Sequence, residues 1–149
     1  GMINTGDSFR QKYGIFEAKI KFENSHSVTQ AFSLVGDFML PEIDVVRANR
    51  KLIMGNYWQV NNNVLKKLFT LCLKRFKKDY YIYTVEWYPD KIIWKINEVN
   101  IASTTTGIPD IPLYLLLNAT IIKELKNSFY ECSMKIDWIK CYKFKDLDN

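Results

Sequence analysis

The sequence predicts an all-β protein, a sandwich of two antiparallel sheets, on three observations. Apolar and polar residues alternate along several segments, with the period of a half-buried strand. Turn residues separate these segments at short intervals, as they do in β-sandwiches. The chain has 149 residues, of which 48% are hydrophobic and 25% charged. A single domain over residues 1–149 therefore has enough apolar surface for a full core.

The strands are predicted in order along the chain. The first covers residues 13–22, and its apolar face consists of Phe16, Ala18, Ile20 and Phe22. Residues 80–97 predict a β-hairpin, because two alternating segments flank Pro89-Asp90, a dipeptide typical of turns. Residues 113–117 are apolar on both faces, which indicates a strand covered from both sides. The last apolar stripe contains Cys132, Met134, Ile136 and Trp138 and continues through Tyr142 and Phe144.

The segment 65–78 is compatible with two structures. Its apolar residues follow helical spacing among lysines and arginines, so a basic amphipathic helix could bind a membrane surface, nucleic acid or an acidic partner. The same residues fit a strand in which Phe69, Leu71 and Leu73 alternate, next to a solvated basic turn. The β pattern on both sides favours the strand. A protein-interaction sandwich that uses the basic segment 66–78 stays open as an alternative function.

Composition excludes several classes of protein. No apolar run reaches the roughly 20 residues that span a bilayer, so no transmembrane segment is predicted. The single histidine, His26, excludes multi-histidine metal sites, and we expect no metal and no cofactor. The net charge of +5 permits an anionic partner, but no nucleic-acid motif accompanies it. In an exported protein Cys132 and Cys141 could pair and leave Cys72 free; otherwise three half-buried thiols are expected.

The most distinctive stretch is residues 41–47. On a strand Glu42 and Asp44 are two residues apart, so both carboxylates face one side. Two close carboxylates raise the pKa of one of them, as acid–base chemistry on sugars requires. A retaining glycosidase also needs a second catalytic carboxylate about 5–5.5 Å from the nucleophile. On this strand the residue in position to supply that carboxylate is Val46, or Arg47 if a bulge adds a residue. Glu42 and Asp44 could also simply be polar residues on a solvated face.

Six segments follow one another in a characteristic order. They are YGIFEAK (13–19), EIDV (42–45), YTVEWYPD (83–90), IIWKIN (92–97), PLYLLLN (112–118) and MKIDWIKCY (134–142). This series resembles glycoside hydrolase family 16, which contains laminarinases, lichenases and agarases. The resemblance implies a concanavalin A-like β-jelly roll whose concave sheet forms a glycan cleft. It also implies a β-linked polysaccharide or oligosaccharide as the ligand, and an extracellular or periplasmic location.

The resemblance assigns catalytic roles to individual residues. Glu42 falls on the nucleophile and Asp44 on the assisting aspartate. The general acid/base falls on Val46 or, in the bulged form of the motif, on Arg47, and neither can protonate a leaving oxygen. We therefore expect a family member with a degenerate site that binds β-glycan with impaired catalysis. The alternative is an active retaining endo-β-glycanase whose acid is Asp44 itself or a loop carboxylate such as Asp37.

Either Val46 or Arg47 is expected to point towards Glu42. If it is Arg47, its guanidinium should form an ion pair with Glu42 or Asp44 and lower the pKa of that carboxylate. Arg47 would then also lie where it can contact the substrate.

Other cleft positions of the family also have counterparts. Tyr57, Trp58 and Asn118 fall on positions that bind substrate, and aromatic rings and amides suit a glycan. Many family members have a histidine shortly before the YTVEW segment, and Tyr81 stands at that position here. They also have an aromatic residue two positions before the nucleophile, where this chain has Leu40. Trp58 could equally be a core residue. The tryptophans expected in the core are Trp87, Trp94 and Trp138.

Family members usually have more chain before the first motif, whereas 12 residues precede Tyr13 here. We therefore expect a jelly roll shortened at the amino terminus, with an exposed edge beside residues 13–22. A homodimer could cover that edge, burying at least about 1,000 Å². Alternatively, residues 3–10 fold back and cap the sheet.

Overall fold

A computed structural model describes residues 1–23, 27–122 and 133–147, so His26 and Cys132 lie outside the described residues. The described chain consists of β-strands and two short 3₁₀ helices. The first strands are β1 (Met2–Asn4), β2 (Gly14–Lys21), β3 (Val28–Val35), β4 (Glu42–Asn49), β5 (Lys51–Val60) and β6 (Asn63–Cys72). After η1 (Leu73–Arg75) come β7 (Tyr81–Trp87), β8 (Ile92–Ile96), β9 (Val99–Thr104), β10 (Tyr114–Ile121), β11 (Lys135–Tyr142) and η2 (Lys145–Leu147).

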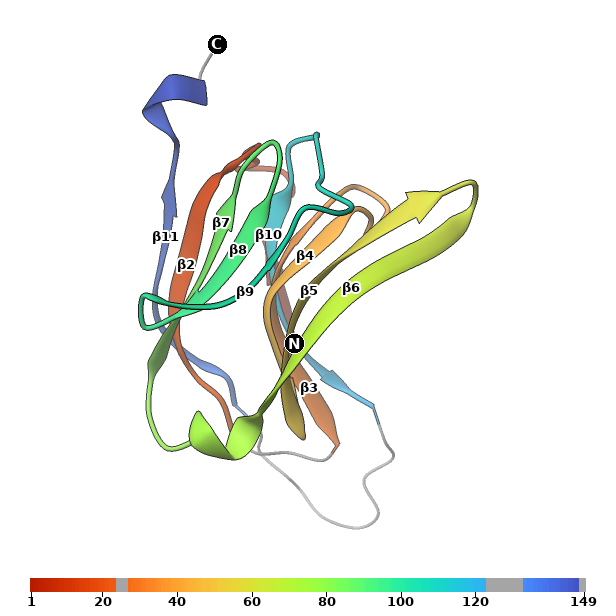
Figure 1. Cartoon of the computed structure of the whole chain (residues 1–149). Helices are drawn as coiled ribbons and strands as arrows, with labels where there is room; N and C mark the ends of the chain where they lie inside the picture. Colours follow the sequence, from red (N-terminus) through yellow and green to blue (C-terminus); the bar gives the residue numbers. More distant parts are fainter. Residues whose placement is uncertain (24–26, 123–132, 148–149) are drawn as a thin grey trace.

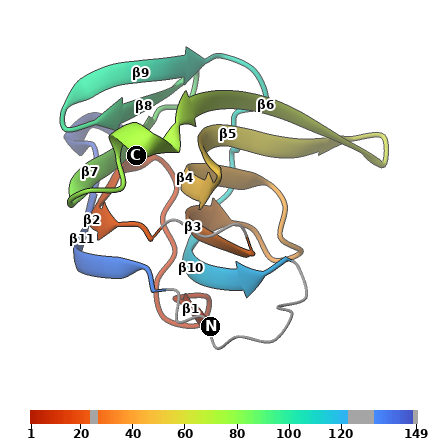
Figure 2. The same ribbon diagram turned by 90° about the horizontal axis from the view of Figure 1, so that it is seen from below.

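The strands form two antiparallel sheets that face each other (Figures 1 and 2). The six-stranded sheet has the order β1-β10-β3-β4-β5-β6, and the five-stranded sheet has the order β11-β2-β7-β8-β9. The hairpin of β5 and β6 projects beyond the rest of the sandwich (Figure 1). The predicted all-β sandwich of two antiparallel sheets is therefore confirmed.

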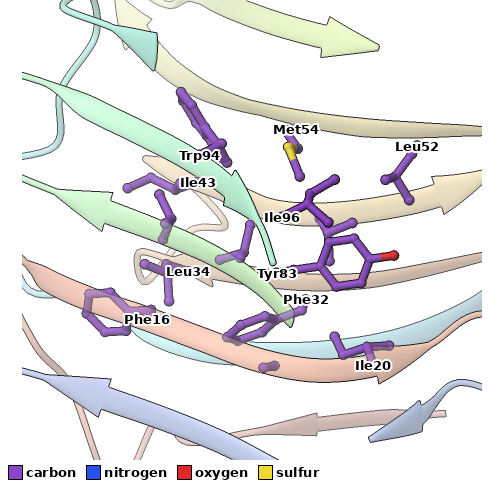
Figure 3. Packing of buried hydrophobic residues seen from close by; sticks show 14 of the residues in the cluster. Phe16, Ile20, Phe32, Leu34, Ile43, Leu52, Met54, Tyr83, Trp94 and Ile96 are labelled. Atoms are coloured by element: carbon purple, nitrogen blue, oxygen red, sulfur yellow. The ribbon is translucent and has the colours of Figure 1, made fainter. Parts of the chain in front are cut away.

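One hydrophobic core lies between the sheets, and side chains from both layers meet in it (Figure 3). Phe16 and Tyr83 come from the five-stranded sheet, and Phe32 comes from the six-stranded sheet. Trp94 adds a polar link, because its indole Nε1 donates a hydrogen bond of 2.9 Å to the backbone carbonyl of Asp44. This bond joins β8 to β4, so it connects the core to the strand with the candidate site.

Most strand predictions are confirmed. Residues 13–22 correspond to β2, the hairpin 80–97 to β7 and β8, and residues 113–117 to β10. The segment 65–78 forms the end of β6, η1 and a turn, so the strand interpretation holds and the amphipathic helix is wrong. Phe69 faces the core, with its ring centroid 5.6 Å from that of Trp94.

The apolar stripe of β11 differs from its prediction. The pairing of β11 with β2 shifts register between Ile136 and Trp138, as at a β-bulge. A bulge reverses which side chains face inward, so Ile139 and Cys141 pack against the core. Trp138 is not a core residue, contrary to expectation; it is half-buried, and Lys140 Nζ lies 4.4 Å from its ring centroid.

The predicted exposed edge beside residues 13–22 is wrong. Strand β2 pairs with β7 on one side and with β11 on the other, so it has no free edge. The amino-terminal residues fold back instead on the other sheet, where β1 pairs with β10 and Gln11 bonds to Leu113. The reason for expecting a dimer at β2 is thereby removed.

We predict that Trp94→Phe lowers the free energy of unfolding by about 1–3 kcal/mol, because the buried carbonyl of Asp44 loses its hydrogen-bond donor. Chemical denaturation followed by circular dichroism measures this change. The matched control is Trp138→Phe on the half-exposed face of β11, which should cost less than about 1 kcal/mol. Equal losses in the two variants would contradict a structural role for the indole bond.

Candidate functional site

A β-bulge in β4 determines which side chains form the site. Val46 lies opposite Phe32, and Asp44 lies opposite Ser33, so Val45 has no partner on β3. The pairing of β4 with β5 shifts register over the same residues. Val45 and Val46 are both fully buried. The two valines therefore pack together into the core, which breaks the simple alternation of the strand.

The bulge brings three charged side chains to one face of β4. Glu42 and Asp44 lie two residues apart, and the extra residue returns Arg47 to their side of the sheet. Of the two residues expected beside Glu42, it is therefore Arg47 that shares its face. Val46 points into the core instead.

Arg47 bonds both carboxylates. Its Nε donates to Asp44 Oδ2 at 2.9 Å, and its Nη2 donates to Asp44 Oδ1 and to Glu42 Oε1, each at 3.0 Å. Ser33 Oγ donates a further bond of 2.6 Å to Asp44 Oδ1. The side chain of Asp44 is completely buried, whereas those of Glu42 and Arg47 are 14% and 31% exposed. The predicted ion pair is therefore present. Arg47 and Glu42 border solvent, whereas Asp44 lies beneath the surface and is bonded to Arg47.

Burial and the neighbouring Asp44 raise the pKa of Glu42 to about 8, and Arg47 only partly offsets them. The charge of Arg47 acts in the expected direction, but burial and Asp44 outweigh it, so the pKa of Glu42 lies above its ordinary value. Two carboxylates share one cation, and most of its hydrogen bonds go to Asp44, so Arg47 compensates Glu42 only in part. Burial lowers the pKa of Arg47, because it disfavours the charged guanidinium. The two carboxylates outweigh burial, so the pKa of Arg47 is raised overall.

Besides Arg47, two of the predicted substrate-binding residues share the face of Glu42. Tyr57 lies directly opposite Glu42 in the pairing of β4 with β5, and burial followed by Asp44 raises the pKa of its hydroxyl. Asn118 lies on β10, two residues beyond Leu116, which is opposite Ser33. Because strand residues two apart face the same side, Asn118 faces the side of the sheet that Ser33 faces.

Trp58 lies on the other face of β5, because it follows Tyr57 directly. Its ring packs so closely against Gly107 that a Cβ on residue 107 would collide with the ring. Asn56 on the same face holds this loop, since its Nδ2 donates to the carbonyls of Thr106 and Gly107, each at 2.9 Å. Trp58 lines a hollow of about 310 Å³ that Leu40 also borders. Glu42, Asp44 and Arg47 are not among the residues that line this hollow.

The remaining candidates also lie elsewhere. Asp37, the proposed loop acid, forms an ion pair with Arg10 at 2.7 Å. Tyr81 lies on β7, and its hydroxyl donates to the carbonyl of Arg75 at 3.1 Å. In the described ranges no three histidine, cysteine, aspartate or glutamate side chains gather as metal ligands. The same residues contain no helix with the length and apolar character needed to cross a bilayer.

Sequence reasoning missed Ser33 and Trp94, which both bond Asp44. Ser33 is a polar residue in a strand that is buried throughout, which was the available signal. Its partner depends on strand register, and the partner of Trp94 depends on how the two sheets stack.

We predict that Glu42 makes stability fall as pH rises from about 4.5 to about 8. The unfolded chain releases this proton near pH 4.5, whereas the folded chain keeps it until about pH 8. The contribution of Glu42 to stability is thus complete below pH 4.5 and declines by about 1.4 kcal/mol per pH unit across the window. Glu42→Gln has no such proton, so its stability relative to the wild type should increase over the same range.

Urea denaturation at pH 4.5, 6 and 8 measures this difference. The matched control is Glu98→Gln, which changes an exposed carboxyl on the turn between β8 and β9. A stability difference between Glu42→Gln and the wild type that stays constant from pH 4.5 to 8 would contradict the raised pKa.

Comparisons with known proteins identify relatives of the whole chain. It is 27% identical to the endo-1,3-1,4-beta-glycanase ExsH of Rhizobium meliloti (strain 1021), over 95% of this chain and 33% of that protein. It is 25% identical to glucan endo-1,3-beta-glucosidase A1 of Niallia circulans, over 96% of this chain and 26% of that protein. The chain therefore spans a third or less of the length of these relatives.

Solved structures share the fold. The laminarinase catalytic domain from Thermotoga maritima MSB8 superposes with a TM-score of 0.77 at 20% identity, over 96% of this chain and 68% of that one. A glycoside hydrolase family 16 endo-glucanase from Bacteroides ovatus gives a TM-score of 0.81 at 18% identity, over 95% of this chain and 74% of that one. The sequence profile described as Glycosyl hydrolases family 16 matches residues 1–140. With this match over nearly its whole length, the chain belongs to glycoside hydrolase family 16.

Proposed function

We propose that this protein binds a β-linked glucan on the outer face of the six-stranded sheet and hydrolyses natural glucans poorly. The observation that carries the proposal is the position of Arg47, whose Nη2 lies 3.0 Å from Glu42 Oε1. A retaining glycosidase has a carboxylic acid beside its nucleophile, and that acid protonates the leaving oxygen. Arginine stays protonated at every relevant pH, so it cannot deliver this proton.

The other carboxylates of the region do not replace the acid. Asp44 is completely buried and accepts hydrogen bonds from Ser33 and Arg47. Asp37 is held by Arg10 on the loop before β4. General acid–base catalysis contributes about 10²–10⁴-fold to rate, and we expect a loss of this order for natural glucans.

Several groups on the outer face suit a sugar chain. Tyr57 offers a partly buried aromatic ring and a hydroxyl beside Glu42, and Arg47 offers a partly exposed cationic side chain. Asn118 adds an amide on the neighbouring part of the sheet. Aromatic rings and a few polar groups are the usual components of a site that binds a small polar ligand. The names of the relatives, a 1,3-1,4-beta-glycanase and a glucan 1,3-beta-glucosidase, favour a β-glucan as that ligand.

We predict that the protein migrates more slowly in native gels that contain laminarin or lichenan, and that Tyr57→Ala removes at least half of this retardation. The control is Tyr142→Ala, which removes a tyrosine that is 46% exposed on β11 of the other sheet. Retardation equal to that of the control would show that Tyr57 is not part of the binding face. Unretarded wild-type protein on both glucans would contradict the proposed function.

Reducing-end release from the same glucans tests catalysis. The wild type should be at least about 10²-fold slower than an active laminarinase, and Arg47→Glu should increase its rate, because it supplies a carboxyl beside Glu42. Wild-type turnover at the rate of an active laminarinase, abolished in Glu42→Gln, would contradict impaired catalysis.

A further inference from the structure

The candidate site keeps the attacking carboxylate and has a cation where the acid belongs. Retaining hydrolysis has two half-reactions: a carboxylate attacks the anomeric carbon while an acid protonates the leaving oxygen, and then a base helps water to attack. The missing acid/base takes part in both proton transfers but not in the attack itself. A donor that needs no proton to leave could therefore still complete the first half-reaction.

We propose that this site accepts β-glucosyl donors whose leaving group departs as a stable anion and that it forms a covalent glucosyl ester on Glu42. The inference rests on the proposed function, because the same face must hold the sugar. A Glu42 oxygen forms a bond to C1 while the bond from C1 to the leaving oxygen breaks. The electron pair of that bond leaves with the departing group, for example as dinitrophenolate, and no proton is transferred.

Arg47 suits an anionic leaving group. Its Nε and Nη2 are held by Asp44 and Glu42, whereas its Nη1 makes no hydrogen bond within the described part of the chain. The side chain is 31% exposed, so it borders the solvent from which a ligand would approach. A guanidinium donates strong, charge-assisted hydrogen bonds to oxyanions. Arg47 would therefore stabilise the departing anion at the position where a carboxylic acid would protonate it.

The glucosyl ester should persist, because no base is placed to deprotonate the incoming water. Azide is an anion and needs no deprotonation. It would attack C1, break the bond to Glu42, release a β-glucosyl azide and return the carboxylate. Azide should therefore accelerate turnover of an activated donor, whereas it should do nothing for a natural glucan, whose first half-reaction is blocked.

Ionisation of Glu42 sets the pH dependence of the first half-reaction. The groups that face Glu42 are Asp44 and Arg47 on β4, Ser33 on β3 and Tyr57 on β5. Burial and Asp44 raise the pKa of Glu42 to about 8, although Arg47 and Ser33 act in the opposite direction. Only the ionised carboxylate attacks, so the rate should rise with pH and level off above about pH 8.

The experiment uses the full chain with dinitrophenyl β-laminaribioside as donor and follows dinitrophenolate release from pH 6 to 9. We expect the wild type to release dinitrophenolate at least about 10²-fold faster than Glu42→Gln. Azide should raise the steady-state rate of the wild type by about 10²-fold, which is the lower limit of what a general base contributes. Glu98→Gln is the matched control and should behave like the wild type. Intact-mass measurement should show one added disaccharide unit, and peptide mapping should place it on Glu42.

Release at the same rate in the wild type and in Glu42→Gln, or a label on another residue, would overturn the inference. Mapping of the label uses the wild type alone, so the inference stays testable if Glu42→Gln does not fold. Laminarin gels run on the same sample separate the two proposals. Retarded protein without a covalent label rejects only the covalent step, whereas unretarded protein rejects glucan binding itself.

Discussion

The pairing of Arg47 with Asp44 is the interaction on which the site depends. Asp44 is completely buried, and a buried carboxylate is costly unless it is paired and hydrogen-bonded. Arg47 supplies two of its hydrogen bonds and Ser33 supplies a third. Because these bonds satisfy Asp44 first, Glu42 receives only one bond from Arg47. The two carboxylates consequently differ in hydrogen bonding although they lie on the same strand face.

The surrounding fold holds this pairing in place. The bulge in β4 puts two valines into the core and returns Arg47 to the face of Glu42. Trp94 reaches from the other sheet and bonds the carbonyl of Asp44 within that bulge. Gly55 lies opposite Asp44 and leaves no space for a Cβ against the backbone of Lys67 on β6. Neighbouring strands and the core thus all restrict the position of Asp44, and through it the position of Arg47.

The sandwich and the charged cluster depend on different residues. The scaffold residues of the family motifs, such as Trp87 and Trp94, are fully buried and hold the sandwich together. Arg47 lies at the solvent side of the cluster, with its side chain 31% exposed, so its identity can change without disturbing the core. Its positive charge also offsets part of the repulsion between Glu42 and Asp44, so the arginine stabilises a pair of carboxylates that would otherwise repel each other.

The sequence by itself determined the β-sandwich, most strands and the common face of Glu42 and Asp44, because alternation of apolar and polar residues is a local property. It left open whether Val46 or Arg47 stands beside Glu42, because that depends on the register of β4 against β3. It misplaced Trp138, since a bulge in β11 reverses the facing of the strand. It predicted that a neighbouring carboxylate raises a pKa and that Arg47 lowers it, but it could not show that burial decides the balance at Glu42. Register, bulges and burial arise from contacts between distant parts of the chain, and only the tertiary structure decides them.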